Sequence, residues 1–225
     1  EIPGTISLDK TSSAPLNRSS SSTPDRRATY PGRWLPNGDN SARPASVLDA
    51  APATYTISPR IQYQSFQYEI RDKMPCLANL SGSGVYTESA GVCAAPAFHT
   101  LGIRIDYSGV SAGASYVPQY VDIAGVTQDM VFETSGSNWA GWVVPTADLG
   151  RVSEIIIPRD TTQEERRSDT IRVYGYADAS TQDGQTLQNQ ATIDWYLRGA
   201  TTATASRQSA PADIFILNAP PFGVT

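Results

Sequence analysis

Few side chains of this sequence have the types and spacing that catalysis requires. His99 is the only histidine, so a Ser-His-Asp site would have to use it, and no GxSxG sequence supplies a nucleophile. A carboxylate pair of the kind that hydrolyses glycosides is compatible with five acidic residues in or beside expected strands, namely Glu69, Asp106, Glu133, Glu154 and Asp194. Nothing selects two of them. We therefore expect His99 to be a hydrogen-bonded residue at a strand edge, and the chain not to be an enzyme.

Motifs for cofactors and metals are missing from the sequence. There is no P-loop, no GxGxxG after an expected strand, no EF-hand loop and no CxxC, and a single histidine makes a zinc site improbable. We expect no cofactor and no metal. The only cysteines are Cys76 and Cys93. We expect two free thiols in a reducing compartment, and a disulfide that closes the Gly/Ser-rich stretch between them is the alternative.

The aromatic residues suggest a third kind of chemistry, the stacking of sugar rings. The chain has 11 Tyr and 4 Trp. Trp139 and Trp142 are three residues apart, so they fall on opposite faces of a strand and do not form a continuous platform. We expect these rings to pack in a core or at subunit contacts.

Short strands are the elements that must position all of these side chains. The chain has 225 residues, 17 Gly, 16 Pro and only 17% charged residues, a composition typical of all-β proteins. The clearest signal lies in residues 152–178, where two β-branched and aromatic runs flank a charged loop at 159–169. Residues 61–70 alternate like one surface strand, and 74–96 look like a long loop. Nine or ten short strands without a convincing helix predict a sandwich, a jelly roll or a barrel.

The distribution of apolar residues divides the chain into three parts. Residues 1–45 are rich in Ser and Pro and are expected to form an extended arm, 46–205 the β-domain, and 206–225 a tail. Six basic and four acidic residues give the arm a charge of +2, while the remainder carries −7. The arm is thus a weak candidate for contacting RNA and a better one for protein contacts. We expect subunit contacts at Tyr30, Trp34 and Leu35 of the arm, and at Arg166 and Arg167 of the charged loop.

No apolar run approaches the roughly 18 residues of a membrane span, and no signal peptide is recognisable at the polar N-terminus. The chain begins with Glu1 instead of Met. That start is compatible with release from a precursor.

The order of these features resembles the major capsid proteins of picorna-like viruses, especially their insect and algal members. The resemblance rests on the Ser-rich arm and on four segments in order, HTLGIRIDYSG, SEIIIP, TIRVYGYAD and ATIDWYLRGA, which span about residues 98–200. It implies an eight-stranded antiparallel jelly roll with an extended arm and tail, one of several capsid subunits that assemble an icosahedral shell around single-stranded RNA. The implied location is the virion. The implied partners are other shell subunits, genomic RNA through the arm, and a host receptor.

One departure from that family concerns Asp178. Some members carry an Asp-Asp-Phe motif linked to maturation cleavage, whereas this chain reads YGYADAS and contains no Asp-Asp pair. We therefore expect a structural role for this region.

Two other functions fit the same residues. The first is a secreted carbohydrate-binding or adhesive β-sandwich with a Cys76–Cys93 disulfide. The second is a β-sandwich hydrolase, which would need two acids facing one cleft about 5 to 10 Å apart.

Overall fold

The computed structural model describes residues 7–12, 16–19, 53–61, 66–106, 117–135, 139–159, 167–178, 180–182 and 184–219. In these ranges the chain forms a β-sandwich of mainly antiparallel sheets, with one short 3-10 turn, η1 (Thr146–Asp148). The prediction of an all-β sandwich is confirmed. None of the helical turns in the described residues is long and apolar enough to cross a membrane.

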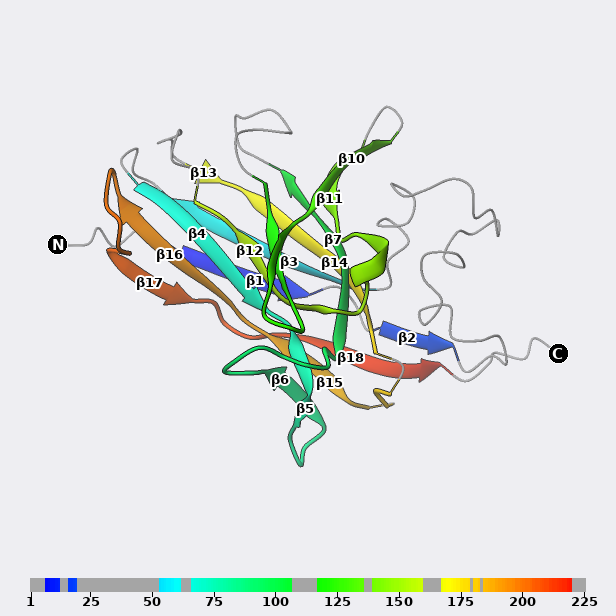
Figure 1. Cartoon of the computed structure of the whole chain (residues 1–225). Coiled ribbons are helices and arrows are strands. Elements are labelled where there is room, and N and C mark those ends of the chain that lie inside the picture. The colour runs from blue at the N-terminus through cyan, green and yellow to red at the C-terminus, as the bar shows by residue number, and fades with distance from the viewer. Residues whose placement is uncertain are drawn as a thin grey trace.

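The first large sheet has seven strands (Figure 1). In spatial order they are β1 (Ser7–Ser12), β3 (Ala53–Ile61), β14 (Thr170–Ala177), β7 (Phe98–Asp106), β11 (Trp139–Val143) and β10 (Val131–Ser135), with β13 (Arg167–Ser168) also paired to β3. All of its pairings are antiparallel. Its centre is the β14–β7 pair, where β-branched and aromatic residues alternate as the sequence predicts.

The second large sheet has six strands, also antiparallel. Their order is β17 (Ala205–Gln208), β16 (Ala191–Leu197), β4 (Phe66–Lys73), β12 (Val152–Ile157), β8 (Gln119–Asp122) and β9 (Thr127–Asp129). All six residues of β12 are buried. β12 lies between β4 and β8 in the sheet, and Val152, Ile155 and Ile157 belong to the core between the two large sheets.

A third sheet lies at one end of the sandwich and includes parallel pairings. It contains β2 (Leu16–Ser19), β18 (Ala212–Ala219), β15 (Thr186–Asn189), β6 (Val85–Glu88) and β5 (Pro75–Leu80). β15 pairs in parallel with β6, and β18 with β2. The hairpin of β5 and β6 extends below the two large sheets in Figure 1.

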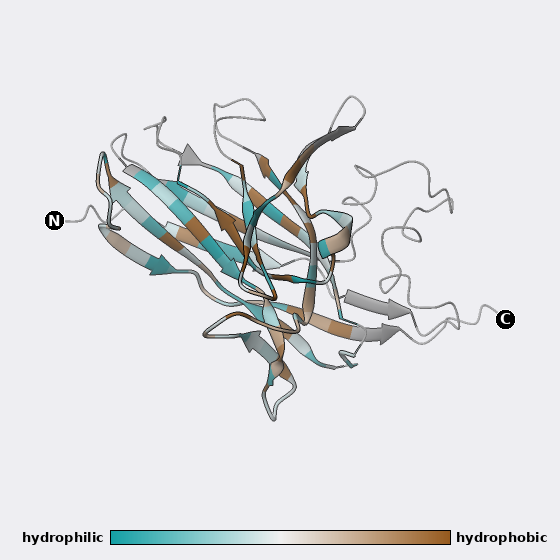
Figure 2. Cartoon of the chain, viewed as in Figure 1, coloured by the Kyte–Doolittle hydropathy of each residue, from teal (hydrophilic) through white to brown (hydrophobic). Residues whose placement is uncertain are grey.

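The principal strands alternate between the two large sheets along the chain. β3, β7, β11 and β14 belong to the seven-stranded sheet, and β4, β8, β12 and β16 to the six-stranded one. Their inner faces bury one apolar core, whose largest fully buried side chains include Trp195, Tyr55, Tyr120 and Phe98. The alternating hydrophobic and hydrophilic bands in Figure 2 follow from this arrangement, because successive side chains of a strand point to opposite faces.

Two predictions about strand limits are wrong. The expected single strand at 61–70 belongs to two sheets, because Ile61 pairs with Arg167 in the first sheet and Phe66 pairs with Leu197 in the second. The expected loop at 74–96 contains β5 and β6, joined by a tight turn in which Gly84 has a positive φ of 80°. The residue alternation continues across the first boundary, so periodicity alone could not reveal it.

Strands also occur in the predicted arm and tail. β1 of the arm is an edge strand of the first sheet, with Leu8 and Lys10 buried. β18 of the tail adds Ile214 and Ile216 to the core. Residues 7–12 of the predicted arm and 212–216 of the predicted tail therefore contribute strands to the sandwich, and the division into arm, domain and tail stays a prediction. In each strand the buried side chains are two residues apart in the sequence, Leu8 and Lys10 in β1, and Ile214 and Ile216 in β18.

Candidate functional site

A polar pocket of about 430 Å³ opens on the outer face of the six-stranded sheet. Its floor consists of side chains that point away from the core: Arg71 and Lys73 of β4, Glu154 of β12 and Thr192 of β16. In the sheet register Glu154 lies opposite Lys73, and Thr192 lies opposite Arg71. The alternation of β4 accounts for the cations, because Arg71 and Lys73 share one face while Asp72 between them points inward.

The wall of the pocket is formed by the end of β6 and the segment that follows it. Glu88, Ser89 and Ala90 line it, and the Lys73 Nζ donates a hydrogen bond of 2.6 Å to the carbonyl oxygen of Ala90. Gln190, between β15 and β16, lines another side and donates through its Nε2 to the carbonyl oxygen of Ser209. The wall is thus tied to the floor by direct hydrogen bonding.

A disulfide between Cys76 and Cys93 fixes the same wall. Cys76 lies in β5, and Cys93 lies three residues after Ala90, so the bond closes the loop that carries the β5–β6 hairpin and the pocket wall. The backbone N–H of Cys93 also donates to the Ser153 Oγ at 2.7 Å. The expectation of two free thiols is wrong, since the hairpin brings two cysteines that are 17 residues apart in the sequence side by side.

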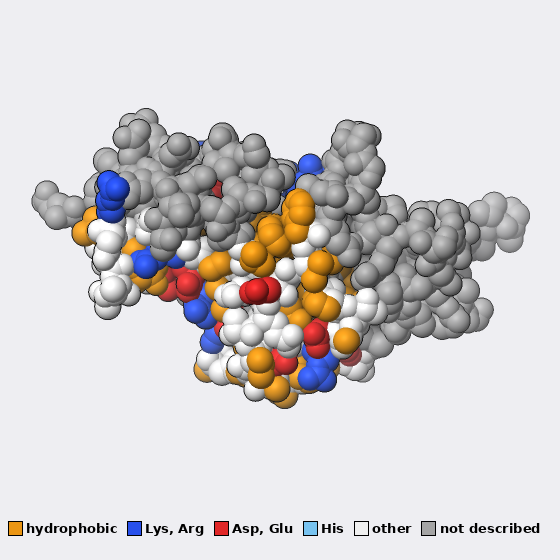
Figure 3. Space-filling view, turned by 45° about the horizontal axis from the view of Figure 1, so that its top comes forward, with side chains coloured by type: hydrophobic (Ala, Val, Ile, Leu, Met, Phe, Trp, Pro, Cys, Tyr) orange, Lys and Arg blue, Asp and Glu red, His pale blue; other side chains and the backbone are white. Residues whose placement is uncertain are grey.

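Basic and acidic side chains contact each other on the pocket floor. Arg71 contacts Glu69 at 2.8 Å and Glu154 at 3.2 Å. Burial lowers the pKa of Arg71, but these two carboxylates outweigh it and the pKa is raised. Burial, assisted by the negative charge of Asp72, raises the pKa of the Glu88 carboxyl. Basic and acidic side chains are also interspersed on the described surface seen in Figure 3, where no large patch has a single sign.

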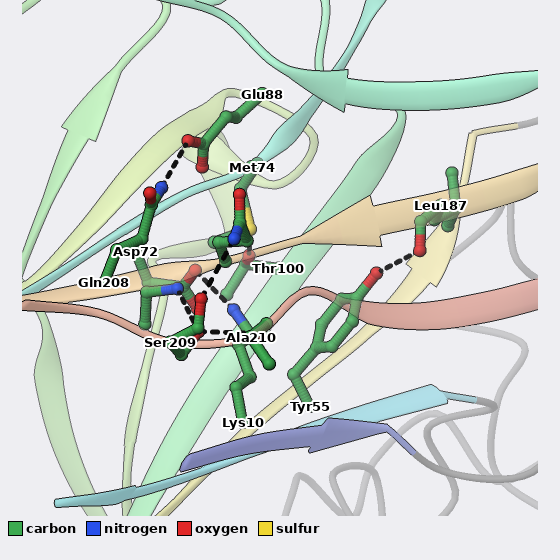
Figure 4. A network of polar contacts seen from close by, with 12 residues as sticks. Lys10, Tyr55, Asp72, Met74, Glu88, Thr100, Leu187, Gln208, Ser209 and Ala210 are labelled. Carbon is green, nitrogen blue, oxygen red and sulfur yellow. Dashed lines mark hydrogen bonds and ion pairs between the residues drawn. The ribbon is translucent and has the colours of Figure 1, made fainter. Parts of the chain in front are cut away.

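A buried ion pair lies on the core-facing side of β4, the strand that carries Arg71 and Lys73 on its outer face. Lys10 of β1 contacts the Asp72 Oδ1 at 2.5 Å, and both side chains are almost fully buried. Lys10 also lies 4.7 Å from the centre of the Tyr55 ring. Burial lowers the pKa of Lys10 and raises the pKa of Asp72. Figure 4 shows the pair together with Glu88, which accepts a 3.4 Å hydrogen bond from the Nε2 of Gln208 in β17.

The single histidine makes a structural contact at the end of the first sheet. The His99 Nε2 lies 3.0 Å from the Asp178 Oδ2, and its ring meets Tyr176 edge to face. Ser180 donates to the Asp178 Oδ1 at 2.5 Å. Its hydroxyl is therefore directed at the acid and away from the histidine, which is not the order of a Ser-His-Asp site. The contact with His99 lowers the pKa of the Asp178 carboxyl, and burial raises it. The contact has the larger effect, so the pKa of this carboxyl stays well below its usual range.

The structure brings three of the five candidate carboxylates, Glu69, Glu154 and Asp194, to the same region of the six-stranded sheet. Glu69 and Glu154 both contact Arg71 on the outer sheet face, and Asp194 lies opposite Glu69 in the register of β16 and β4. Asp106 is at the end of β7 and Glu133 is in β10 of the other sheet.

The expected subunit contacts fall mostly outside the described residues. Tyr30, Trp34, Leu35 and Arg166 lie outside them, and Arg167 is placed only as a backbone partner of Ile61 in β13. Their role stays a prediction.

Sequence reasoning missed most of the pocket. Lys73, Glu88, Gln190 and Thr192 carried no motif, and Glu88 lay in an expected loop. The signal that could have located the floor was the spacing of Glu69, Arg71 and Lys73, which are all charged and two residues apart on one strand face. In the described part of the chain, no group of three or more His, Cys, Asp and Glu side chains is placed to hold a metal ion.

Comparison with known proteins found no matching family model and no matching curated protein. Solved structures do match, at a distance. They include the self-complemented major subunit of Myf fimbriae, MyfA, from Yersinia enterocolitica, with 9% identity, 95% of this chain and 98% of that chain covered, and a TM-score of 0.28. The CssB subunit of enterotoxigenic Escherichia coli colonization factor CS6, complemented with a donor strand from CssA, has 12% identity, coverages of 96% and 99%, and a TM-score of 0.29. The C-terminal domain of the Streptococcus agalactiae AgI/II polypeptide BspA has 12% identity and a TM-score of 0.32, and the match covers 93% of this chain and 49% of that chain.

These comparisons correct the capsid interpretation. The three structures named above are subunits of Myf fimbriae and of colonization factor CS6 and a domain of an AgI/II polypeptide, none of them a viral capsid protein, and no family model or curated protein supports a picorna-like capsid subunit. The predicted capsid function and virion location are therefore wrong. The predicted shell partners and the RNA contact of the arm are not tested. At TM-scores near 0.3 the likeness is distant, and nothing more about this chain follows from it.

Proposed function

We propose that this chain is an extracytoplasmic β-sandwich module that binds carbohydrate or adheres to a surface, and that it acts by binding and not by catalysis. The observation that carries the proposal is the Cys76–Cys93 disulfide. Disulfides form and persist mainly in secreted and surface-exposed proteins. In this chain the bond also holds the wall of the polar pocket, so the oxidised state and the binding site are physically connected.

We also infer a jelly-roll topology for the sandwich. Its support is the alternation of the principal strands between the two sheets, with β14 between β3 and β7 in one sheet and β4 between β16 and β12 in the other. Wrapping of this kind produces the two Greek keys of a jelly roll, a fold used by lectins as well as by viral coats. Because a fold does not determine a function, the functional proposal rests on the disulfide and the pocket. Cross-strand nuclear Overhauser contacts between β14 and β7 and between β4 and β16 test the topology.

Two measurements test the proposed function. Thiol titration of the chain in denaturant, after export to an oxidising compartment, is expected to find no reactive thiol; two reactive thiols would contradict the proposal. A surface-binding assay on immobilised glycans and glycan-bearing cells is expected to show retention that a reducing agent weakens.

The matched control is the variant with both Cys76 and Cys93 changed to Ser, whose binding should be weak with or without reductant. Release of reducing sugar from the same glycans would contradict the assignment of a purely binding role.

A further inference from the structure

The outer-face pocket has the chemistry of a particular ligand class. Its described lining residues include two cations, Arg71 and Lys73, and two carboxylates, Glu88 and Glu154, whose formal charges cancel. Arg71 is engaged by Glu69 and Glu154, and Lys73 by the Ala90 carbonyl. A ligand with a net charge would be repelled by the side chains of like charge in this mixed lining, whereas a neutral ligand can add hydrogen bonds without such repulsion.

Donors and acceptors alternate around the pocket. Lys73 has three N–H donors and uses one on Ala90. Within the described part of the chain, the Glu88 carboxylate accepts one long hydrogen bond, from Gln208 at 3.4 Å, and the Thr192 hydroxyl can both donate and accept. Adjacent hydroxyl groups on a sugar ring are also donors and acceptors at once, so each can bridge a lysine or threonine donor and a carboxylate acceptor.

The size of the pocket fits a small molecule, and the described residues that line it are mainly charged or polar. The volume of about 430 Å³ lies in the range of small-molecule pockets, roughly 300 to 1,000 Å³. The residues that line it are Arg71, Lys73, Glu88, Glu154, Gln190 and Thr192, with Ser89 and Ala90 on the wall. None of the described residues that line the pocket is aromatic, so these residues offer hydrogen bonds and no stacking platform.

We propose that this pocket binds an uncharged pyranose unit through hydrogen bonds from Lys73 and Thr192 and to Glu88. This proposal rests on the proposed function and makes its site and ligand class specific. Glu88 has the central role, because it is the carboxylate of the pocket that is not engaged by Arg71, and a ligand hydroxyl would satisfy it.

The test uses the intact, oxidised chain and a panel of methyl pyranosides of glucose, galactose and mannose. Methyl glucuronide and glucosamine serve as anionic and cationic counterparts. Saturation-transfer NMR detects binding, and isothermal titration measures it. At least one neutral pyranoside is expected to bind in the millimolar range, at least about tenfold more tightly than both charged compounds.

Two pocket variants with matched controls locate the site. Glu88→Gln and Thr192→Val are each expected to weaken the neutral ligand about tenfold, the loss of one ligand hydrogen bond. Asp129→Asn and Thr127→Val make the same chemical changes on β9, at the far edge of the same sheet, and should leave binding unchanged. Thermal melts of all four variants check that the fold is retained.

The outcomes separate the two proposals. Tighter binding of glucuronide or glucosamine overturns the ligand class, and neutral binding that both pocket variants leave unchanged overturns the site. If no pyranoside of the panel binds while the oxidised chain is still retained on glycan surfaces, this inference fails and the proposed function stands. If the oxidised chain is not retained on any glycan surface either, both fail.

Discussion

Replacing Lys10 with Met tests whether β1 is an integral part of the fold. The change keeps an apolar stem of similar length and leaves Asp72 buried without its cation. A buried carboxylate in that position is neutralised by protonation. Holding a carboxyl of ordinary pKa 3.8 protonated at pH 7 costs about 1.4 kcal/mol for each of about three pH units, so Lys10→Met should lower the free energy of unfolding by about 4 kcal/mol.

The pH dependence of that loss has a definite sign. In the variant the folded carboxyl stays protonated while the unfolded one ionises above pH 4, so unfolding releases a proton and stability falls as the pH rises. The cost of Lys10→Met should shrink to about 1.5 kcal/mol at pH 5 and nearly vanish at pH 4. Urea denaturation followed by tryptophan fluorescence at pH 7, 5 and 4 measures it.

A double variant distinguishes two causes of the loss, the burial of Asp72 without its cation and the removal of the attraction between Lys10 and Asp72. The double variant with Lys10→Met and Asp72→Leu removes both charges. Its free energy of unfolding should lie within about 1 kcal/mol of the parent's, because the desolvation penalty of the ion pair disappears together with its attraction. The Asp72 Oδ2 already lacks a hydrogen-bond partner among the described residues, which increases that penalty. A single variant that loses less than about 1 kcal/mol at pH 7, or a cost independent of pH, would refute this reasoning about β1.

Three further changes test other parts of the sandwich. Asp178→Asn should destabilise the chain at pH 7 and progressively less below about pH 4, because a depressed pKa contributes stability that is lost as the pH falls through it; equal losses at pH 7 and pH 3 in urea denaturation would contradict this. Changing both Cys76 and Cys93 to Ser should cost about 3 kcal/mol of unfolding free energy for a loop of this length, measured against the oxidised parent, and no loss would show that the bond does not constrain the unfolded chain. Gly102→Ala should cost about 1 to 3 kcal/mol, because its Cβ would lie 2.4 Å from a backbone carbonyl oxygen of β11, whereas the control Gly82→Ala, which meets nothing within 4 Å, should be neutral in the same assay.

Strand-level features of the fold were accessible from the sequence, and the relations between strands were not. The runs at β12 and β14 were visible because β-branched residues cluster in strands that bury most of their residues. The disulfide was not, because its geometry depends on how β5 and β6 pair, and two cysteines in an expected loop have no fixed separation. The pocket was hidden for a similar reason, since its floor combines residues of β4, β12 and β16 that only the sheet register places together.

Lys10 shows why the N-terminal residues were assigned to an arm. A lone lysine among Ser, Thr and Asp indicates a solvated segment, because lysine is almost never fully buried unless it is paired. Its partner, Asp72, lies 62 residues later between two surface cations, and no local pattern distinguishes that inward-facing acid from its neighbours. The pairing buries both charges only because β1 adds to the edge of β3 and directs Lys10 across to the second sheet. The strand whose composition looks least like a core strand therefore links the two sheets through its one basic residue.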